Sequence, residues 1–151
     1  MEQVKQCIIW GNFNNGEYND CIIDNDANIF DENILTVKYY GQNTGRDDHY
    51  MCNNSIFVEC NKTDNKKYKF IGRVIRIEQI ETEKITKLYI YSNKKKNIYT
   101  KEMREYDIKI YKLTIQKENN ENFNNREEVL KYFNLTGGNP QSGITRHLII
   151  N

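Results

Sequence analysis

The segment Gly41–Tyr50 (GQNTGRDDHY) brings Arg46, two aspartates and a histidine into four consecutive positions. An arginine can contact a phosphate or the edge of a guanine, and Asn43 can read a base edge. Loops of this composition are where folded scaffolds often carry binding groups. The segment therefore predicts a nucleic-acid contact. The alternative is a surface loop in which Arg46 pairs with Asp47 or Asp48.

His49 and His147 are the only histidines of the chain. Two imidazoles can act as the acid and base of RNA cleavage near neutral pH. Nothing in the sequence brings these two together. The sequence contains no phosphate-binding glycine loop, no Gly-x-Ser-x-Gly and no His-Glu-x-x-His. A small nuclease is therefore the third hypothesis, and the sequence favours a protein without catalytic activity.

The four cysteines include no Cys-x2-Cys pair. His49, Cys52 and Cys60 are conceivable zinc ligands, but only the first two have the close spacing that zinc sites use twice. With no export signal at the N-terminus, disulfides are not expected. We therefore expect ordinary thiols, no metal and no cofactor.

Aromatic residues offer a second way to bind nucleic acid. Trp10 is the only tryptophan, and Tyr39 and Tyr40 are neighbours at the end of an expected strand, so they face opposite sides of it. An aromatic face beside a basic surface can stack a base, which is worth about 1–3 kcal/mol. We predict this role for Trp10 with one of the two tyrosines. The alternative is that all three fill the core.

The net charge of +1 is the sum of two unlike halves. Residues 1–60 hold three basic and ten acidic residues, a net charge of −7, and residues 61–151 have a net charge of +8. Such asymmetry indicates an anionic partner. The alternative is that the two halves neutralise each other, within one chain or between copies.

The basic excess is expected to lie on one face that tracks a phosphate backbone, with binding that weakens as salt rises. The alternative is a solvated edge that discourages aggregation. The residues of this face are Lys62, Lys66, Lys67, Lys69, Arg73 and Arg76, followed by Lys94, Lys95 and Lys96 at a hairpin tip.

Short apolar and β-branched runs between turn residues predict the strands that position these side chains. Gly72, inside the longest run, predicts a bulge or a bend. Residues 86–92 are expected to pair with 68–80, and Asn93–Asn97 to form a charged turn. The seven predicted strands are 4–11, 34–40, 55–60, 68–80, 86–92, 106–116 and 143–150, and a further brief strand is conceivable at 21–23.

The last part of the chain predicts a helix. Residues 118–125 (ENNENFNN) are expected to form a polar linker, after which Asn125 and Glu128 make an N-terminal cap. The helix is expected over 124–136, stopped by two glycines. Residues 1–151 are thus predicted to form a single mainly β (α+β) domain. It would be a small barrel or a strongly bent antiparallel sheet, with about seven strands and one C-terminal helix.

Composition limits the class and the source. The chain contains 22 Asn, 20 Ile, 16 Lys and 11 Tyr but a single proline, which indicates an A/T-rich genome such as that of a large DNA virus. No apolar run approaches the roughly 20 residues that span a bilayer. We expect an intracellular protein that does not associate with membranes, or a virion component if the source is viral.

The middle of the chain resembles the PUA-like superfamily, in particular EVE and YTH domains. The resemblance spans residues 39–78, and its landmarks are Asn43, Arg46 and Met51, the strand Ile56–Val58 and the segment Phe70–Val74. It implies a small β-barrel with flanking helices that binds RNA or a modified base in an aromatic-walled pocket. Trp10, Tyr40, Asn43 and Arg46 would form that pocket.

The leading hypothesis is a non-catalytic nucleic-acid-binding module, with phosphates on the basic face and a base near residues 41–50. A structural or protein-interaction module that self-associates through its acidic and basic halves is the alternative.

Overall fold

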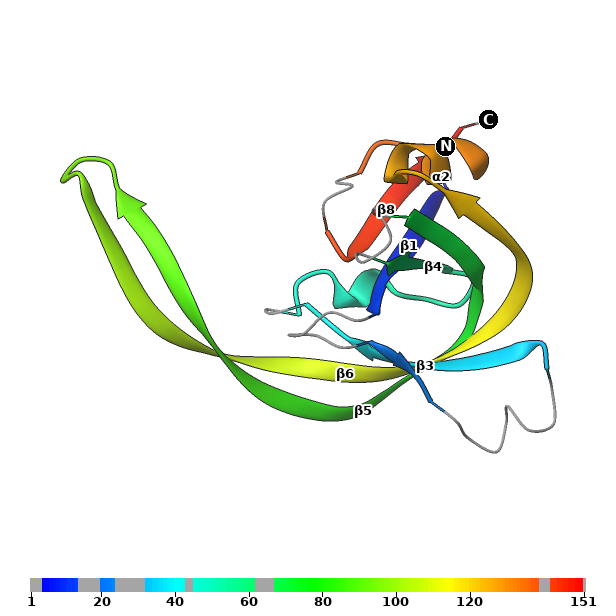
Figure 1. Ribbon diagram of the computed structural model, residues 1–151, viewed down its shortest axis with the longest axis horizontal. Helices are drawn as coiled ribbons and strands as arrows, with labels where there is room; N and C mark the ends of the chain where they lie inside the picture. The colour runs from blue at the N-terminus through cyan, green and yellow to red at the C-terminus, as the bar shows by residue number, and fades with distance from the viewer. Residues whose placement is uncertain are drawn as a thin grey trace.

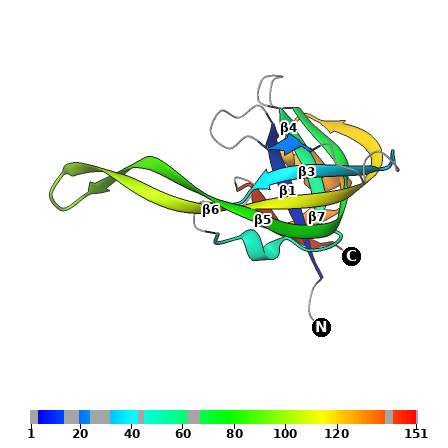
Figure 2. The same cartoon turned by 90° about the horizontal axis from the view of Figure 1, so that it is seen from below.

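A single, strongly bent sheet makes up most of the protein (Figures 1 and 2). The computed structural model describes residues 4–13, 20–23, 32–42, 45–61, 67–138 and 142–150. The elements are β1 (Lys5–Phe13), β2 (Cys21–Ile22), β3 (Ile34–Tyr40), the 3-10 helix η1 (Asp48–Tyr50), β4 (Ile56–Asn61), β5 (Lys67–Asn93), β6 (Ile98–Phe123), α2 (Arg126–Tyr132), β7 (Leu135–Thr136) and β8 (Ile144–Ile149).

The strand order in the sheet is β2-β3-β6-β5-β4-β1-β8-β7. The prediction of a mainly β fold with one C-terminal helix is confirmed. The sheet is bent but not closed, so of the two predicted forms the bent sheet is correct and the closed barrel is not. It is also mixed, because β1 and β4 run parallel while the other pairs are antiparallel.

Two very long strands dominate the sheet. β5 and β6 pair with each other along their whole lengths, and the register shifts at three places, between Phe70 and Gly72, Val74 and Arg76, and Gln79 and Glu81. Such bulges bend a strand and increase its twist. A Cβ at Gly72 would lie 2.0 Å from the carbonyl oxygen of Gln116, so the first bulge requires glycine. The predicted bend at Gly72 is confirmed.

The pairing of β5 and β6 corrects two predictions. Residues 86–92 do not pair with 68–80, because the chain between these segments is strand and 86–92 pair with 99–105 of β6. The first six residues of the predicted linker 118–125 likewise belong to β6. The stretches 81–85 and 118–123 are both polar. They form strand because each pairs with residues far away in the sequence, and local propensity does not reveal such a partner. The turn at Asn93–Asn97 is confirmed, with a hydrogen bond from Lys96 N to Asn93 O of 3.2 Å.

The predicted cap at Asn125 is confirmed, but α2 begins at Arg126 instead of 124 and ends earlier than predicted. The side chain of Asn125 accepts a hydrogen bond from the backbone N–H of Glu128 at 2.9 Å, and the Glu128 carboxylate accepts one from Asn124 N at 2.8 Å. Asn125 is therefore the N-cap, and Glu128 reaches back one residue further, to the residue before the cap. The helix stops at Tyr132 instead of 136, since Asn134 adopts a positive φ of 57° and the next two residues pair with β8 as β7.

Alternating residues of β1 and β4 fill two separate apolar clusters, because neighbouring side chains of a strand point to opposite faces. Ile9 and Phe57 belong to the cluster that β3 and β6 also fill. Ile8 and Trp10 belong to the other, which Val129 of α2 helps to cover. In the described ranges, no helix is both long and apolar enough to cross a bilayer.

Candidate functional site

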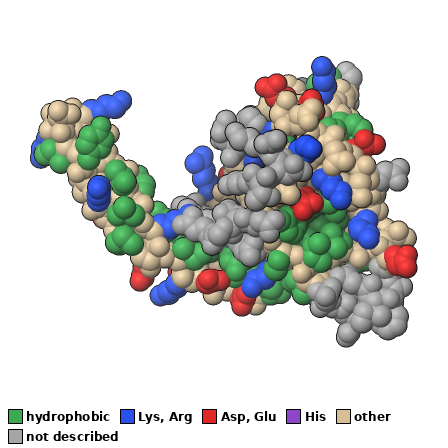
Figure 3. Space-filling view, in the orientation of Figure 1, with side chains coloured by type: hydrophobic (Ala, Val, Ile, Leu, Met, Phe, Trp, Pro, Cys, Tyr) green, Lys and Arg blue, Asp and Glu red, His purple; other side chains and the backbone are tan. Residues whose placement is uncertain are grey.

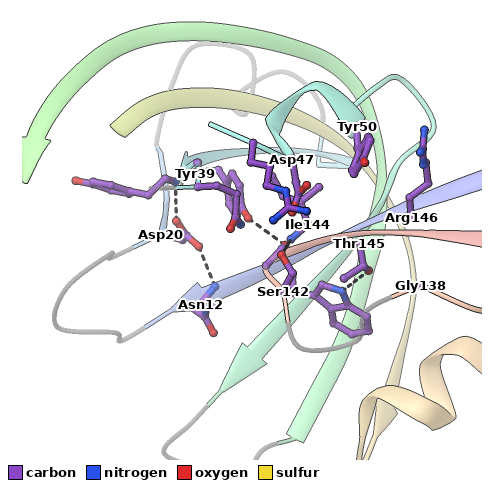
Figure 4. A pocket seen from close by; sticks show the side chains of 16 residues that line it. Asn12, Asp20, Tyr39, Asp47, Tyr50, Gly138, Ser142, Ile144, Thr145 and Arg146 are labelled. Atoms are coloured by element: carbon purple, nitrogen blue, oxygen red, sulfur yellow. Dashed lines mark hydrogen bonds between the residues drawn. The ribbon is translucent and has the colours of Figure 1, made fainter. Parts of the chain in front are cut away.

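The open side of the bent sheet is bridged by one buried carboxylate. Asp20 Oδ2 accepts a hydrogen bond from Asn12 N of β1 at 2.9 Å, and its Oδ1 accepts one from Tyr40 N of β3 at 2.8 Å (Figure 4). The Tyr39 hydroxyl adds a 3.1 Å hydrogen bond to the carbonyl oxygen of Gly143. β1 and β3 therefore face each other across a seam that side chains span.

A cavity of about 720 Å³ lies at this seam, between β1, β3, the segment 41–50 and the start of β8. Trp10, Tyr40 and Arg46, which the sequence singled out, all line it. Asn43, the fourth residue predicted for a base pocket, lies outside the described residues. Asp20 and Arg146 also line the cavity, and the sequence analysis did not identify them.

Asp48 fixes the segment that carries Arg46. Its carboxylate is buried and accepts hydrogen bonds from Gln42 N at 2.9 Å and from the Tyr111 hydroxyl at 2.9 Å. Gly41 makes room for it, because a Cβ there would lie 2.5 Å from Asp48 Oδ2. The alternative in which Arg46 pairs with Asp48 is therefore wrong. Within the described ranges Arg46 forms no ion pair with any carboxylate.

The cavity wall carries charged side chains of both kinds. Arg46 and Arg146 line it together with Asp47 and Asp20. The guanidinium of Arg146 lies 4.1 Å from the centre of the Tyr50 ring. Asp20 is only 4% exposed, and this burial raises its pKa to about 7, although its two backbone hydrogen bonds act in the opposite direction.

Trp10 is a core residue and cannot offer a face to a base. Its side chain is fully buried, the Arg126 guanidinium lies 4.4 Å from the ring, and Tyr68 packs edge-on at 5.7 Å. Its Nε1–H donates a 2.8 Å hydrogen bond to the Thr145 hydroxyl. The stacking role predicted for Trp10 is therefore not available in this conformation. Tyr40, which is half-buried at the cavity, keeps its place in the hypothesis.

His147 is equally structural. It is buried, its Nδ1 lies 2.6 Å from the Gly137 carbonyl oxygen and its Nε2 lies 2.7 Å from the Thr145 hydroxyl. A carbonyl oxygen only accepts, so Nδ1 carries the proton and Nε2 accepts from Thr145. Burial lowers the pKa of this imidazole. His49 is exposed and lies against Tyr50, with 4.3 Å between the ring centres, whereas both ring nitrogens of His147 are already engaged, so His147 is not available to it as an acid/base partner.

The conceivable zinc ligands do not assemble. Cys60 is buried in β4 and Cys52 is exposed. Among the residues whose positions are described, no three His, Cys, Asp or Glu side chains gather closely enough to hold a metal ion.

The predicted basic face is divided between distant parts of the molecule (Figure 1). Lys67 and Lys69 lie at the start of β5, next to β4. Arg73 contacts Glu118 at 3.8 Å, and Arg76 pairs with Glu78. Lys62 and Lys66 lie outside the described residues. The remaining members, Lys94, Lys95 and Lys96, lie at the far end of the β5–β6 hairpin.

That hairpin forms an arm, defined as residues 82–109, that projects from the body of the protein (Figures 1 and 2). β3 pairs with β6 only at 110–116 and β4 pairs with β5 only at 67–73, so the arm is a two-stranded ribbon. Of the thirteen exposed large apolar side chains in the described ranges, seven lie between residues 88 and 103. The arm is thus both the most isolated and the most apolar exposed element (Figure 3).

The two faces of the arm differ. Leu88 pairs with Met103, Ile90 with Lys101 and Ser92 with Tyr99, so these side chains share one face, which we call the apolar face after most of its members. Its four apolar members are 53–74% exposed. On the other face Arg104 lies 3.7 Å from the centre of the Tyr89 ring, so that face is partly covered by its own side chains.

No protein-family model, no curated protein and no solved structure matches this chain.

Proposed function

We propose that the protein is an assembly module whose arm docks on a second copy of the same chain. The observation that carries this proposal is the apolar face, formed by Leu88, Ile90, Tyr99 and Met103 on a ribbon that has water on both sides. Two-stranded ribbons are at best marginally stable alone in water. Tyr, Met and aliphatic side chains gathered on one exposed surface are typical of a protein interface.

Charge favours the body of another copy over its arm as the docking surface. Residues 86–105, the distal part of the arm, hold six basic and two acidic residues. Two such arms packed face to face would bring like charges together. The first 60 residues of another copy, with a net charge of −7, attract the arm instead. Reciprocal exchange of arms would give a two-fold dimer, and one-way docking a ring or a filament.

Sedimentation velocity over a concentration series tests this proposal. We expect the wild-type protein to associate at about 50 mM salt and at least tenfold more weakly at about 500 mM, because salt screens the attraction between arm and body. The double variant Leu88→Ser/Met103→Ser should associate about 100-fold more weakly, since two of the four apolar side chains of the apolar face become polar. Circular dichroism checks that the variant keeps its sheet.

The matched control is Ile150→Ser, which removes an exposed isoleucine far from the arm in the sequence. It should associate like the wild type. A concentration of about 100 μM is well above the Kd of ordinary specific interfaces. The proposal would be contradicted if the wild type stayed monomeric at this concentration in low salt.

Nucleic-acid binding is the second candidate function, and the tip of the arm favours it. Lys94, Lys95 and Lys96 are exposed at the turn, with Lys101 and Arg104 on the adjoining strand. A two-stranded ribbon fits the major groove of B-DNA, which is about 12 Å wide. The phosphate contacts would then lie on the distal arm, and no continuous basic face is needed.

Fluorescence anisotropy with labelled duplex and single-stranded DNA and RNA tests this candidate. We expect Lys94→Gln/Lys95→Gln/Lys96→Gln to weaken binding about tenfold or more and to reduce its salt dependence by about three phosphate contacts. The variant Leu88→Ser/Met103→Ser keeps these lysines and separates the two functions, because it should lose self-association alone. Absence of binding at low salt would exclude this candidate.

A further inference from the structure

The seam cavity is built from elements that the sheet itself does not join. β1 and β3 are not neighbours in the sheet, yet Asp20 ties Asn12 to Tyr40 across the opening. Asp48 joins Gln42 N to the Tyr111 hydroxyl of β6. The cavity wall is therefore held by partly buried hydrogen bonds. Its volume of about 720 Å³ is in the range of sites that enclose a whole small molecule.

Two arginines reach this cavity without an anionic partner. Within the described part of the chain, neither Arg46 nor Arg146 forms an ion pair. The guanidinium of Arg146 stacks on Tyr50 at 4.1 Å. Stacking occupies the face of a guanidinium and leaves its in-plane N–H groups free, and these match the oxygens of a phosphate or a carboxylate.

The rest of the wall accepts hydrogen bonds. Figure 4 shows Arg146 beside Tyr50 toward one end of the cavity and Asp20 beside Asn12 toward the other, with Asp47 between them. Asp47 is half-buried and suits a ligand that carries hydroxyl or amino donors, whereas both oxygens of Asp20 already accept backbone hydrogen bonds. Because Asp47 stands in the same wall as the two arginines, the cavity does not suit a ligand that is anionic over its whole length.

From this arrangement we infer that the cavity binds a phosphate monoester of a sugar or nucleoside, with the phosphate on Arg46 and Arg146 and hydroxyl donors toward Asp47. A monoester phosphate offers three terminal oxygens, enough to engage two guanidinium groups that come from different elements. Its source is a free nucleotide or sugar phosphate, or the phosphorylated end of a nucleic-acid strand. The site does not depend on self-association through the arm.

Isothermal titration calorimetry with AMP, ribose 5-phosphate, inorganic phosphate and a short 5′-phosphorylated oligonucleotide tests the inference. We expect AMP or the oligonucleotide to bind, and the tighter of the two identifies the source. Arg46→Ala and Arg146→Ala should each weaken binding about tenfold or more, as expected for the loss of a charged hydrogen-bond donor. Adenosine, which lacks the phosphate, should not bind.

Arg76→Ala is the matched control, because Arg76 is exposed, pairs with Glu78 and does not line the cavity. It should bind within about twofold of the wild type, as surface substitutions away from a site usually do. The arm variant Leu88→Ser/Met103→Ser should also bind normally, so failure of the assembly proposal leaves this test intact. The inference is overturned if no probe binds, if the two cavity variants bind like the wild type, or if inorganic phosphate binds as tightly as the monoesters.

Discussion

Thr145→Val should lower the free energy of unfolding by about 4 kcal/mol, because it deprives two buried polar groups of a partner at about 1–3 kcal/mol each. The Thr145 hydroxyl accepts from Trp10 Nε1 at 2.8 Å and donates to His147 Nε2 at 2.7 Å. Valine has nearly the same shape and no hydroxyl. Both neighbouring rings are buried. Urea unfolding monitored by tryptophan fluorescence measures the change.

Thr145→Ser is the control for this effect. It keeps the hydroxyl and loses one methyl group, which should cost about 1 kcal/mol. In a Trp10→Phe background, Thr145→Val should cost less than in the wild type, since the indole N–H is already gone. Equal costs for Thr145→Val and Thr145→Ser would show that the hydroxyl does not link the two rings.

Local signals predicted the features whose causes are local. Asn125 and Glu128 stand three residues apart and cap the helix, Asn125 by accepting from Glu128 N and Glu128 by accepting from Asn124 N. Gly72 marks a bulge because a side chain there would strike the neighbouring strand. The turn at Asn93–Asn97 follows from its own composition. In each case the residues that decide the structure are close together in the sequence.

The arm could not be predicted in this way. Glu83 is paired with Ile108 and Lys84 with Asp107, so polar residues of β5 are strand because of residues about 25 positions later. An edge or ribbon strand with water on both sides also lacks the alternation that burial imposes. The parallel contact of β1 and β4 is likewise decided by distant residues.

The candidate site could be predicted only in part, because residues distant in the sequence form it. Aromatic and basic residue types pointed to Trp10, Tyr40 and Arg46, and the structure places all three at one cavity. Residue type alone did not distinguish a buried indole from an accessible one. Asp20 lies beside an Asn-rich stretch and gave no signal, because its importance comes from two backbone N–H groups on different strands. Thr145 and His147 were hidden for the same reason.

Asp20 makes the stability of the fold depend on pH in an unusual direction. A carboxyl group in an unfolded chain has a pKa of about 4, whereas burial raises that of Asp20 to about 7. Between these values the folded state holds a proton that the unfolded state has lost. Stability must therefore fall as the pH rises toward 7, and stay level above it.

Raising the pH from about 5 to about 8 should thus cost the wild type about 3 kcal/mol more than it costs Asp20→Asn, which remains neutral throughout. His147 acts in the opposite direction, since its lowered pKa makes its contribution fall away below pH 6.5. It is present in both proteins, so the difference between their pH profiles isolates Asp20. Urea unfolding at several pH values measures that difference. Parallel profiles would mean that the bridging carboxylate is already ionised at pH 5, and that its two backbone hydrogen bonds outweigh its burial.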